Sequence, residues 1–423
     1  MTDRLPLTLR LYRATAAALA PLAPGVLAAR ARRGREDAGR LGERLGRSER
    51  GRPGGRLAWL HGVSVGESLS LLPLIERVRA ERPDAGVLVT SGTRASAEIL
   101  ADRIPEGVIH QYAPVDTPAA VAGFLDHWRP DLGVLAESEL WPGLILAAEA
   151  RGVRLALVSA RLSPRSAQGW SRAPAAARRL LGAFDLILAR DEDAAAVLRR
   201  LGASVSGLAD LKFGAAPPPV DAAELARARD ALAGRPLLLA ASTHSGEDAI
   251  VLDAFARARG AGSPLLAIAP RHPRRGGEIE TLALARGFAT GRRGRSTAVA
   301  GLDVHVADTL GELGLWYRLA AGAFVGGSLS PGVGGHNPLE AARLGCPVAV
   351  GPHTGNWPVF EVLERFAAVT RVASVETLAT WFRAALGGTD DLRAAVARAR
   401  AWVEARDDEA REASGRIVAL LPP

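Results

Sequence analysis

Short apolar runs that alternate with helical patterns are the feature that most restricts the fold of this chain of 423 residues. In the first half, each run is followed by a stretch of helical periodicity, which is typical of buried parallel strands joined by crossover helices. The predicted strands of this half are residues 57–60, 87–90, 132–136, 155–158 and 186–189. A second series begins after Pro217-Pro218-Pro219, with predicted strands at residues 237–241, 265–269, 323–325 and 347–350.

Two such series joined by a proline hinge predict an α/β chain of two Rossmann-like, doubly wound domains. Because ligands of open parallel sheets bind beyond the carboxyl ends of the strands, we expect them in a cleft that the two domains face. The arginine-rich face of the last stretch predicts a helix that packs back over a neighbour. The predicted division is an N-terminal segment at 1–50, a first domain at 51–216, a second domain at 217–389 and a C-terminal helical stretch at 390–423.

The charge of the chain predicts an anionic partner. The formal net charge of +8 leaves nucleic acid, an acidic membrane surface and a phosphorylated substrate as candidates. Of the 53 basic residues only Lys212 is a lysine. We interpret Lys212 as a position whose role an arginine side chain cannot fill. The alternative is that this lysine has been retained by chance. The single cysteine, Cys346, permits no internal disulfide and favours a reducing compartment.

The first 50 residues predict a membrane-associated helical segment. Residues 14–29 are uncharged, but these 16 residues are fewer than the roughly 20 that a membrane span requires, and Pro21, Pro24 and Gly25 interrupt them. An apolar stretch of this length, followed by arginines between positions 30 and 52, suits a peripheral position on an anionic membrane surface. The alternative is an ordinary N-terminal helix packed on the domain.

A glycine-rich stretch at residues 324–342 predicts a strand, a loop and a helix start in succession. Asn337 is expected to cap the helix, with Pro338 at its first position. Since a helix start exposes unpaired N–H groups and the positive end of the helix dipole, we expect a phosphate there, and Glu340 to accept hydrogen bonds from a ribose or base. The glycines alone fit a tight strand-to-helix connection equally well, and the sequence HNPLE at 336–340 favours the ligand site.

Acidic residues follow two predicted strands of the first domain. Glu67 lies in the sequence VSVGES, in the first turn of a predicted helix, where a carboxylate can take a proton from an attacking hydroxyl. The flanking glycines clear space around it and favour this role over that of a capping glutamate that only satisfies backbone donors. Glu137 and Glu139 end another strand and project to opposite sides, so only one can face the cleft, and we expect it to be Glu137.

Basic side chains lie at the same edge of the predicted sheet. The sequence SARLSPRS at 159–166 offers hydroxyls and the guanidinium of Arg161 to an anionic substrate. Lys212 lies just before the proline hinge, where its ammonium can reach the cleft as a compact charge.

The second domain places five polar loops at the carboxyl ends of its predicted strands, which indicates one shared binding site. The loops are STHSGED with Ser242 and His244, PRHP with Arg271 and His272, DTLGEL with Gly311, the stretch at 324–342, and GPHTGN at 351–356. Arg271 and His272 are expected to clamp a phosphate or carboxylate, and Gly311 to leave room for a flat ring or ribose. HExxH spacing, cysteine pairs, the dinucleotide fingerprint and the Walker A sequence do not occur, so we expect no metal, no nicotinamide dinucleotide and no P-loop nucleotide.

The order of these motifs resembles that of one known family. The chain contains VSVGES, ESELWP, SARLSPRS, LKF, STHSGED, PRHP, DTLGEL, FVGGSL, GGHNPLEAA and GPHTGN in succession. They resemble the motifs of the 3-deoxy-D-manno-octulosonic acid (Kdo) transferases of lipid A assembly, glycosyltransferases of the GT-B architecture. The resemblance implies transfer of Kdo from CMP-Kdo, without a cofactor, to a tetra-acylated, bis-phosphorylated lipid A precursor (lipid IV-A). It also implies inversion, a place at the cytoplasmic face of the inner membrane and no nucleic-acid partner.

The resemblance further implies roles for single residues. Glu67 matches the catalytic base of the family, and Glu137 and Lys212 match positions thought to stabilise the transition state. Three segments match the CMP-binding segments of the family: residues 271–272, 310–312 and 337–340. The substrate-binding candidates are Ser64, Gly66, Arg161, Ser242, His244, Arg271, His272, Leu310, Gly311, Glu312, Gly334, Gly335, His336, Asn337, Pro338, Leu339 and Glu340.

Three positions depart from the family pattern. Ala209 replaces a glycine before the lysine motif, Gly214 replaces an acid after it, and Val115 stands where the family often has tyrosine. Two other classes of function remain open: another GT-B enzyme, such as an epimerase or a transferase that uses a uridine nucleotide, and a membrane-associated nucleotide-binding protein without catalysis. Turnover of CMP-Kdo distinguishes a Kdo transferase from another GT-B enzyme. Substitution of Glu67 by alanine distinguishes a Kdo transferase from a binding protein without catalysis, because only the transferase loses activity.

Overall fold

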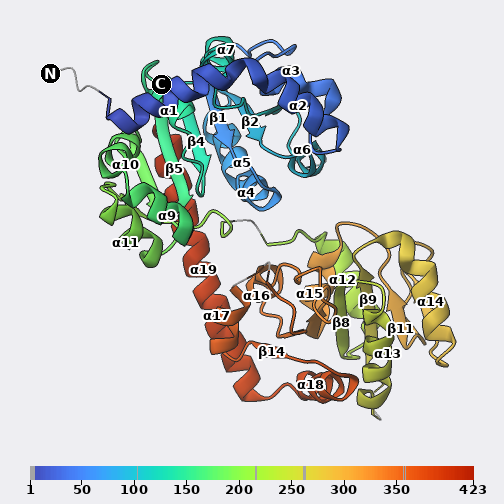
Figure 1. The fold of residues 1–423 in the computed structure, drawn as a ribbon. Helices are drawn as coiled ribbons and strands as arrows, with labels where there is room; N and C mark the ends of the chain where they lie inside the picture. Colours follow the sequence, from blue (N-terminus) through green and yellow to red (C-terminus); the bar gives the residue numbers. More distant parts are fainter. Residues whose placement is uncertain (1–4, 102, 215–216, 261–262, 356, 358) are drawn as a thin grey trace. The chain divides into compact units, whose positions relative to one another are not determined.

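The computed structural model describes residues 5–101, 103–214, 217–260, 263–355, 357 and 359–423. The chain forms two units, which are Met1–Ala215 with Arg406–Pro423, and Ala216–Ala405 (Figure 1). Each unit is built around one parallel sheet. Asn356, the last residue of the GPHTGN motif, lies outside the described residues.

The sheet of the first unit has seven parallel strands in the order β3-β2-β1-β4-β5-β6-β7. The strands are β1 (Leu57–His61), β2 (Gly86–Ser91), β3 (Ile109–Tyr112), β4 (Leu132–Ala136), β5 (Arg154–Ala160), β6 (Leu186–Ala189) and β7 (Gly207–Leu208). The predicted strands of this half are confirmed, and the two strands that the sequence did not predict, β3 and β7, are the edges of the sheet. The strand order reverses between β1 and β4, which pair directly.

Helices cover both faces of this sheet. They are α4 (Val65–Ser70), α5 (Leu72–Glu81), α6 (Arg94–Ala101), α7 (Pro118–Trp128), α8 (Pro142–Glu149), α9 (Pro164–Ser171), α10 (Pro174–Leu181), α11 (Glu192–Arg200) and the last part of α19 (Asp390–Val418). Trp59 of β1 is buried in one core with residues of α7, α8, α10 and α11. Its neighbour Leu60 is buried in a second core with α5, α6 and three residues of α19, namely Ala413, Ile417 and Val418. The end of the chain therefore completes one face of the first unit.

The N-terminal helical segment is longer than the sequence indicated. It comprises α1 (Leu7–Leu19), the 3-10 turn η1 (Ala20–Leu22) and α2 (Ala23–Arg32), followed by η2 (Ala38–Arg40) and α3 (Leu41–Arg44). The predicted interruption is present in part, since the 3-10 turn that contains Pro21 separates α1 from α2. The chain nevertheless stays helical, because each proline lies in the first turn of the element that follows, where the missing N–H group costs no hydrogen bond. The resulting run of 26 residues, Leu7–Arg32, meets the length and composition of a membrane span, although only 6% of its apolar window is buried.

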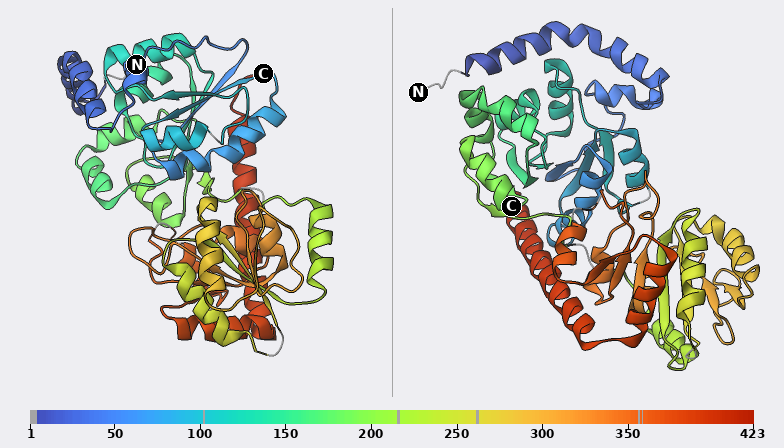
Figure 2. Two further views of the ribbon diagram at one scale, coloured as in Figure 1. Left: turned by 90° about the vertical axis from the view of Figure 1, so that its right-hand side faces the viewer. Right: turned by 60° about the horizontal axis from the view of Figure 1, so that its bottom comes forward.

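The sheet of the second unit has seven parallel strands in the order β10-β11-β9-β8-β12-β13-β14, which reverses between β8 and β12. The strands are β8 (Leu237–Thr243), β9 (Leu265–Pro270), β10 (Thr290–Arg292), β11 (Val304–Val306), β12 (Ala320–Val325), β13 (Val348–Val350) and β14 (Val369–Arg371). The helical elements are α12 (Ala222–Leu232), α13 (Glu247–Ala258), η3 (Pro273–Arg275), α14 (Gly276–Leu284), α15 (Leu313–Leu319), α16 (Leu339–Arg343), α17 (Val359–Arg365) and α18 (Val375–Gly387). Figure 2 gives two further views of these elements. The four strands predicted from the sequence are confirmed, and β10, β11 and β14 were not predicted.

Gly46 offers a test of how closely the N-terminal segment packs on α7. Its φ is +77°, and a Cβ there would lie 2.0 Å from the carbonyl oxygen of Ala120. Gly34 has a similar φ of +72° but no atom within 4 Å of its Cβ position. We expect Gly34→Ala to lower the free energy of unfolding by about 1 kcal/mol through backbone strain alone. Gly46→Ala is expected to cost about 1–3 kcal/mol more through the clash, as measured by urea unfolding of the two variants. Equal losses of unfolding free energy in the two variants would show that the N-terminal segment moves away from α7 at no cost.

Candidate active site

The candidate residues gather where the strand order of each sheet reverses. Glu67 follows β1 and Glu137 follows β4, and these two strands are paired neighbours. In the second unit, the STHSGED loop follows β8 and the glycine-rich stretch follows β12, which is again a directly paired couple. Open parallel sheets bind their ligands beyond the strand ends at such points. The fold therefore places both sets of candidates at the edges where open parallel sheets commonly bind ligands.

Glu67 belongs to a capping box at the start of α4. Its Oε2 accepts hydrogen bonds from the backbone N–H groups of Val63 (2.7 Å) and Ser64 (3.4 Å), and its Oε1 accepts one from the hydroxyl of Ser64 (2.8 Å). The capping arrangement that the sequence left open is thus present. An ionised carboxylate has about four acceptor positions, so these three bonds leave room for a further donor. A Cβ at neighbouring Gly66 would meet no atom within 4 Å, so there is space beside it.

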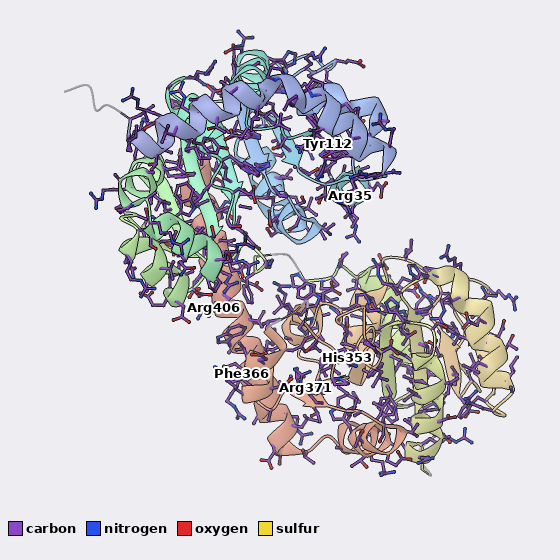
Figure 3. The ribbon with its side chains drawn as sticks, in the orientation of Figure 1. Arg35, Tyr112, His353, Phe366, Arg371 and Arg406 are labelled. Atoms are coloured by element: carbon purple, nitrogen blue, oxygen red, sulfur yellow. The ribbon has the colours of Figure 1, made fainter. Side chains whose placement is uncertain are left out.

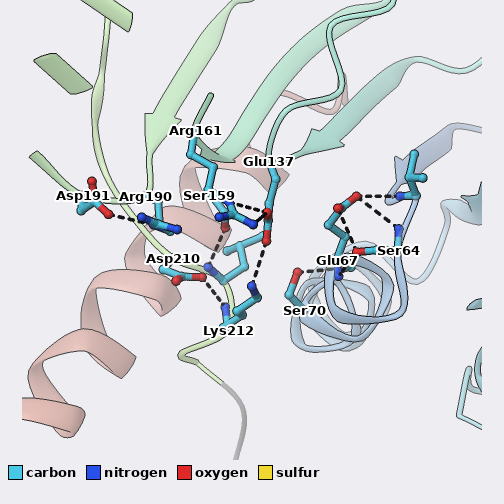
Figure 4. A network of polar contacts seen from close by, with 12 residues as sticks. Ser64, Glu67, Ser70, Glu137, Ser159, Arg161, Arg190, Asp191, Asp210 and Lys212 are labelled. Atoms are coloured by element: carbon cyan, nitrogen blue, oxygen red, sulfur yellow. Dashed lines mark hydrogen bonds and ion pairs between the residues drawn. The ribbon is translucent and has the colours of Figure 1, made fainter. Parts of the chain in front are cut away.

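Glu137 is the centre of a charged cluster in the first unit, shown in Figure 4. Its Oε1 accepts a hydrogen bond from the ammonium of Lys212 at 2.9 Å, and its Oε2 accepts bonds from Nε and Nη2 of Arg161 at 2.6 Å each. The side chain of Glu137 is 5% exposed, whereas those of Lys212 and Arg161 are 36% and 47% exposed. The only lysine of the chain and the predicted guanidinium therefore meet at one buried carboxylate. Arg161 is bound to protein here, whereas the sequence suggested only a substrate contact.

The electrostatics of this cluster keep Glu137 ionised. Burial by itself would raise the pKa of Glu137, but the hydrogen bonds and charges of Lys212 and Arg161 outweigh it and hold the pKa below its usual value. Asp210, whose Oδ1 accepts the backbone N–H of Lys212 at 3.0 Å, shows the opposite balance. Its burial raises the pKa above the ordinary range, and the nearby charge of Lys212 compensates only in part. Two neighbouring carboxyl groups with opposed shifts are typical of functional sites.

Three residues other than glycine adopt left-handed backbone conformations at these strand ends. They are Glu137 (φ +57°), Ser159 (φ +50°) and Ser242 (φ +57°). Ser159 and Ser242 occupy irregularities in the pairing of β5 and β8. Each such residue costs about 1–2 kcal/mol, and strain of this kind concentrates at functional sites. The strained backbone of Ser242 therefore supports its prediction as a site residue. The hydroxyl oxygen of Ser159 accepts a hydrogen bond from the N–H of Leu211 at 2.9 Å, which holds the residue before Lys212 in place.

Glu247 is a residue whose importance the sequence did not reveal. It is 1% exposed, and its carboxylate accepts four backbone N–H groups: His244 (2.9 Å), Gly327 (2.7 Å), Ser328 (2.9 Å) and Leu329 (3.0 Å). The motif STHSGED suggested only an acid at a helix start. The side chain instead joins the loop after β8 to the loop after β12.

This clamp changes the expected use of the glycine-rich loop. The N–H groups of residues 327–329 are already bound to Glu247, so they do not serve a phosphate. The glycines that follow remain available for a close approach, since Gly334 and Gly335 have φ values of +83° and +80°. The N–H of Gly335 donates to the carbonyl of Gly327 at 2.8 Å, which folds this part of the loop back on itself.

His244 and His336 form a directly bonded pair in the second unit. Their Nε2 atoms lie 2.8 Å apart and their rings stack at 12° with centroids 5.1 Å apart. Burial lowers the pKa of His336 to about 4, with added effects of His244 and Arg271, and burial likewise lowers the pKa of His244. Both rings are therefore neutral at pH 7, so one Nε2 donates its hydrogen and the other accepts it. The loops after β8 and β12 are joined a second time by this bond.

The helix at the HNPLE motif starts one residue later than predicted, because α16 begins at Leu339 with Pro338 at the cap position. The side-chain oxygen of Asn337 accepts the N–H of Leu339 at 3.0 Å, and Pro338 already has helical angles of −83° and −14°. Glu340 lies on the first turn, with Oε1 3.5 Å from the amide nitrogen of Asn337. The helix α16 has only five residues, Leu339–Arg343, so its dipole is small and the side chains of the motif must provide most of any anion binding.

The remaining candidates of the second unit fall into two places. Arg271 and His272 are exposed at the end of β9, and the ring of His272 lies 6.1 Å from that of His244, so this pair joins the histidine cluster. Gly311 and Glu312 of the DTLGEL loop, which follows β11, line a cavity of about 370 Å³. Its lining consists of Pro219, Val220, Asp221, Glu224, Gly311, Glu312 and Leu315. Leu310 is 78% exposed, and the Glu312 carboxylate is bound to Arg293 at 2.8 Å.

The loop after β13 completes the edge of the second sheet (Figure 3). The N–H of His353 donates to the carbonyl of Ser328 at 3.0 Å, and Arg371 of β14 donates to the hydroxyl of Thr354 at 3.0 Å. Within the described part of the chain, no cluster of three or more histidine, cysteine, aspartate or glutamate side chains has a geometry that would hold a metal ion. The expectation that the protein binds no metal and no cofactor stays a prediction.

Comparison with known proteins identifies the family. A family model described as 3-deoxy-D-manno-octulosonic-acid transferase matches residues 39–215. A 3-deoxy-D-manno-octulosonic acid transferase of Bordetella pertussis is 36% identical over 363 residues, which cover 82% of this chain and 83% of the relative. The chain belongs to the 3-deoxy-D-manno-octulosonic acid transferase family. It is thus a transferase, as the ordered motifs indicated.

Two further comparisons place this transferase among its relatives. A probable mitochondrial 3-deoxy-D-manno-octulosonic acid transferase of Arabidopsis thaliana is 34% identical over 360 residues, 82% of this chain and 80% of the relative. A solved glycosyltransferase of Rickettsia africae shares the fold at a TM-score of 0.52 and 12% identity, covering 86% of this chain and 99% of that one. The predicted GT-B fold, with two Rossmann-like domains in one chain, is confirmed.

The histidine pair predicts a stability that depends on pH. The pKa of His336 is about 4 in the folded transferase and about 6.5 in the unfolded chain, so the unfolded state binds more protons between these values. Stability should therefore fall as the pH drops from 6.5 to 4. We expect His336→Asn to remove on the order of 2 kcal/mol of that fall in urea unfolding followed at several pH values. The control is Gln168→Asn on α9, an exposed residue without a titratable group, which should keep the wild-type slope; equal slopes in all three proteins would contradict the prediction.

Proposed function

We propose that the protein transfers Kdo from CMP-Kdo to lipid IV-A, the tetra-acylated and bis-phosphorylated lipid A precursor, with inversion at the anomeric carbon. Membership of the family supports the transfer of Kdo. The observation that favours this reaction most directly is the arrangement at the β1 and β4 ends, where Glu67 stands opposite a carboxylate already neutralised by Lys212 and Arg161. One acid is free of cationic partners among the described residues, and the other is paired with two.

This difference supports separate roles for the two carboxylates. Glu67 is bound to neutral donors only, so its carboxylate can take up the proton of an acceptor hydroxyl. Glu137 is held ionised by two cations, which makes it a poor proton acceptor but a firm support for Lys212. We propose that the ammonium of Lys212, fixed in this way, stabilises negative charge that develops in the transition state.

In the proposed step, the acceptor oxygen forms a bond to the anomeric carbon of Kdo while the bond from that carbon to the phosphate oxygen of CMP breaks. The proton of the acceptor hydroxyl goes to Glu67, and the bonding electrons leave with the phosphate of CMP. No redox partner or cofactor is needed, because CMP itself is the leaving group. Attack from the side opposite the leaving group gives inversion.

We propose that the second unit binds the donor through side chains of the histidine cluster and the HNPLE motif. Arg271 bears the exposed positive charge at the end of β9 and suits the phosphate of CMP. The neutral pair His244 and His336 provides one ring N–H and one ring acceptor, both at Nδ1, without adding charge, and Asn337 fixes the start of α16. Ser242, Gly334 and Gly335 offer backbone in left-handed conformations beside these side chains.

The role of Glu67 can be separated from its capping function by substitution. Glutamine still completes a capping box, so Glu67→Gln should keep the unfolding free energy within about 1 kcal/mol of wild type. Without a carboxylate, kcat for Kdo transfer should fall about 100- to 10,000-fold while CMP binding persists. The control is Glu76→Gln, an exposed residue of α5, which should transfer at the wild-type rate. Mass spectrometry of lipid products measures transfer, and calorimetry measures CMP binding; wild-type turnover by Glu67→Gln would exclude this residue as the base.

We also propose that the N-terminal segment lies in the interface of the inner membrane at its cytoplasmic face. One side of the segment is attached to the first unit, since Leu9 and Leu27 are 2% and 3% exposed. Its other side presents apolar residues to solvent: Leu7, Leu11, Leu19, Leu22 and Val26, each at least 55% exposed. A helix that is docked along one side and apolar on the other favours lying on a bilayer over crossing it. The arginines that follow it suit an anionic leaflet.

Membrane association should depend on this apolar side. We expect the combined change Leu11→Ser, Leu19→Ser and Leu22→Ser to lower partitioning onto vesicles of anionic phospholipid at least tenfold, because about 0.8 kcal/mol is lost for each buried methylene. The control is Leu284→Ser, which removes a leucine of equal exposure (55%) from the second unit and should leave binding unchanged. Co-sedimentation with vesicles measures both. Unchanged sedimentation of the triple variant would show that this side does not contact the membrane.

A further inference from the structure

Asp116 joins three separate parts of the first unit through one carboxylate. Its Oδ2 accepts a hydrogen bond from the hydroxyl of Tyr12 on α1 at 2.7 Å and one from the N–H of Gly143 at 2.9 Å. Its Oδ1 accepts the N–H of Leu144 at 2.7 Å. The same side chain therefore touches the N-terminal helical segment and the first turn of α8.

Asp116 acts as the cap of α8 from a distant position in the sequence. Trp141, the residue at the cap position of that helix, provides no side-chain hydrogen bond to the helix start. The approach of the carboxylate requires glycine at position 143, because a Cβ there would lie 2.6 Å from Oδ1 of Asp116. The position of the first turn of α8 is thus fixed by Asp116.

The start of α8 in turn bounds the loop that bears Glu137. Strand β4 ends at Ala136 and α8 begins at Pro142, so only residues 137–141 lie between them. Glu137 is the first residue of this loop and has a strained φ of +57°. A loop so short transmits a shift of the helix start to Glu137 and hence to the bond with Lys212.

The N-terminal segment also holds the backbone around Asp116. The N–H of Val115 donates to the carbonyl of Arg44 at 2.8 Å, and the N–H of Tyr112 donates to the carboxylate of Glu43 at 2.7 Å. The guanidinium of Arg44 bonds the carbonyl of Ala113. At Tyr12 itself the packing is open, because a cavity of about 270 Å³ lies beside its bond to Asp116. The hydrogen bond, rather than close packing, sets the contact of α1 at this point.

We propose that Tyr12 and Asp116 are positioning residues that connect the membrane-contacting segment to the catalytic loop. When the apolar side of α1 and α2 rests on an anionic bilayer, the segment is held in place, the bond from Tyr12 to Asp116 persists, and the start of α8 is ordered. Turnover on a membrane-embedded acceptor therefore exceeds turnover on the same acceptor headgroup in solution. This inference rests on the proposed membrane association and transfer.

Hydrogen exchange tests the connection without any turnover. In the wild-type protein, saturating vesicles of anionic phospholipid should slow the exchange of the N–H groups of Gly143 and Leu144 about fivefold, the factor of one ordinary hydrogen bond. In Tyr12→Phe, which keeps the ring but lacks the hydroxyl, vesicles should not slow this exchange, although co-sedimentation shows full binding. The matched control is Tyr112→Phe. The hydroxyl of Tyr112 makes no hydrogen bond within the described part of the chain, whereas its backbone N–H and ring make contacts that phenylalanine keeps. Vesicles should therefore slow exchange in this variant as they do in the wild-type protein. A wild-type response of Tyr12→Phe would overturn the proposal.

Asp116→Asn separates capping from the connection. An amide there keeps one acceptor oxygen and replaces the other with a donor, so one of the two N–H groups loses its partner. Exchange at residue 143 or 144 should therefore rise with and without vesicles. One outcome is that exchange rises in Asp116→Asn while vesicles still slow exchange in Tyr12→Phe as they do in the wild-type protein. In that case Asp116 is a cap alone, and the connection to the membrane segment is refuted. In transfer assays, Tyr12→Phe should lower kcat on vesicle-embedded acceptor about fivefold, with KM for CMP-Kdo unchanged. Absence of Kdo transfer by the wild-type protein would refute the proposed function, whereas the exchange experiment would still decide the connection.

Discussion

The reversal of strand order at β1 and β4, and again at β8 and β12, is the constraint on which the rest of the structure depends. Crossover helices leave such a point in opposite directions, so the loops there diverge and the strand ends stay open to ligands. At one of these points the chain places Glu67 and Glu137, and at the other it places a clamp made by Glu247 and the His244–His336 pair. The chemistry of the protein follows from which side chains stand at these two edges.

Charge is distributed within these edges so that similar side chains do different work. Glu67 receives only neutral donors, Glu137 receives two cations, and Glu247 receives four backbone N–H groups. A carboxylate with neutral donors keeps the capacity to accept a proton, one paired with cations stabilises their position, and one surrounded by amides fixes backbone. The local partners therefore distinguish the three acids, as their proposed roles require.

The sequence predicted the central strands and most loops, because buried strands of a parallel sheet are continuous apolar runs. It did not predict β3, β7, β10 and β14, which are the four edge strands and are short or polar, nor β11, which has His305 between two valines. The side chains at the strand ends were identifiable from motifs. The partner of Glu247 lies 80 residues away at Gly327, and such a contact leaves no local pattern. Likewise, the prolines at 21 and 24 indicated the interruption but not that the chain stays helical through it, because a pattern does not show which turn of a helix they occupy.

The entry of α19 into the core beneath Leu60 makes the first unit discontinuous along the chain. During synthesis, the strands β1 to β7 leave the ribosome long before Ala413, Ile417 and Val418 are made. The part of that face which α19 covers must therefore wait, with its apolar residues uncovered, until the second unit has been translated. Folding of the first unit is therefore completed only when residues 413–418 have been made, and without them part of its core is missing.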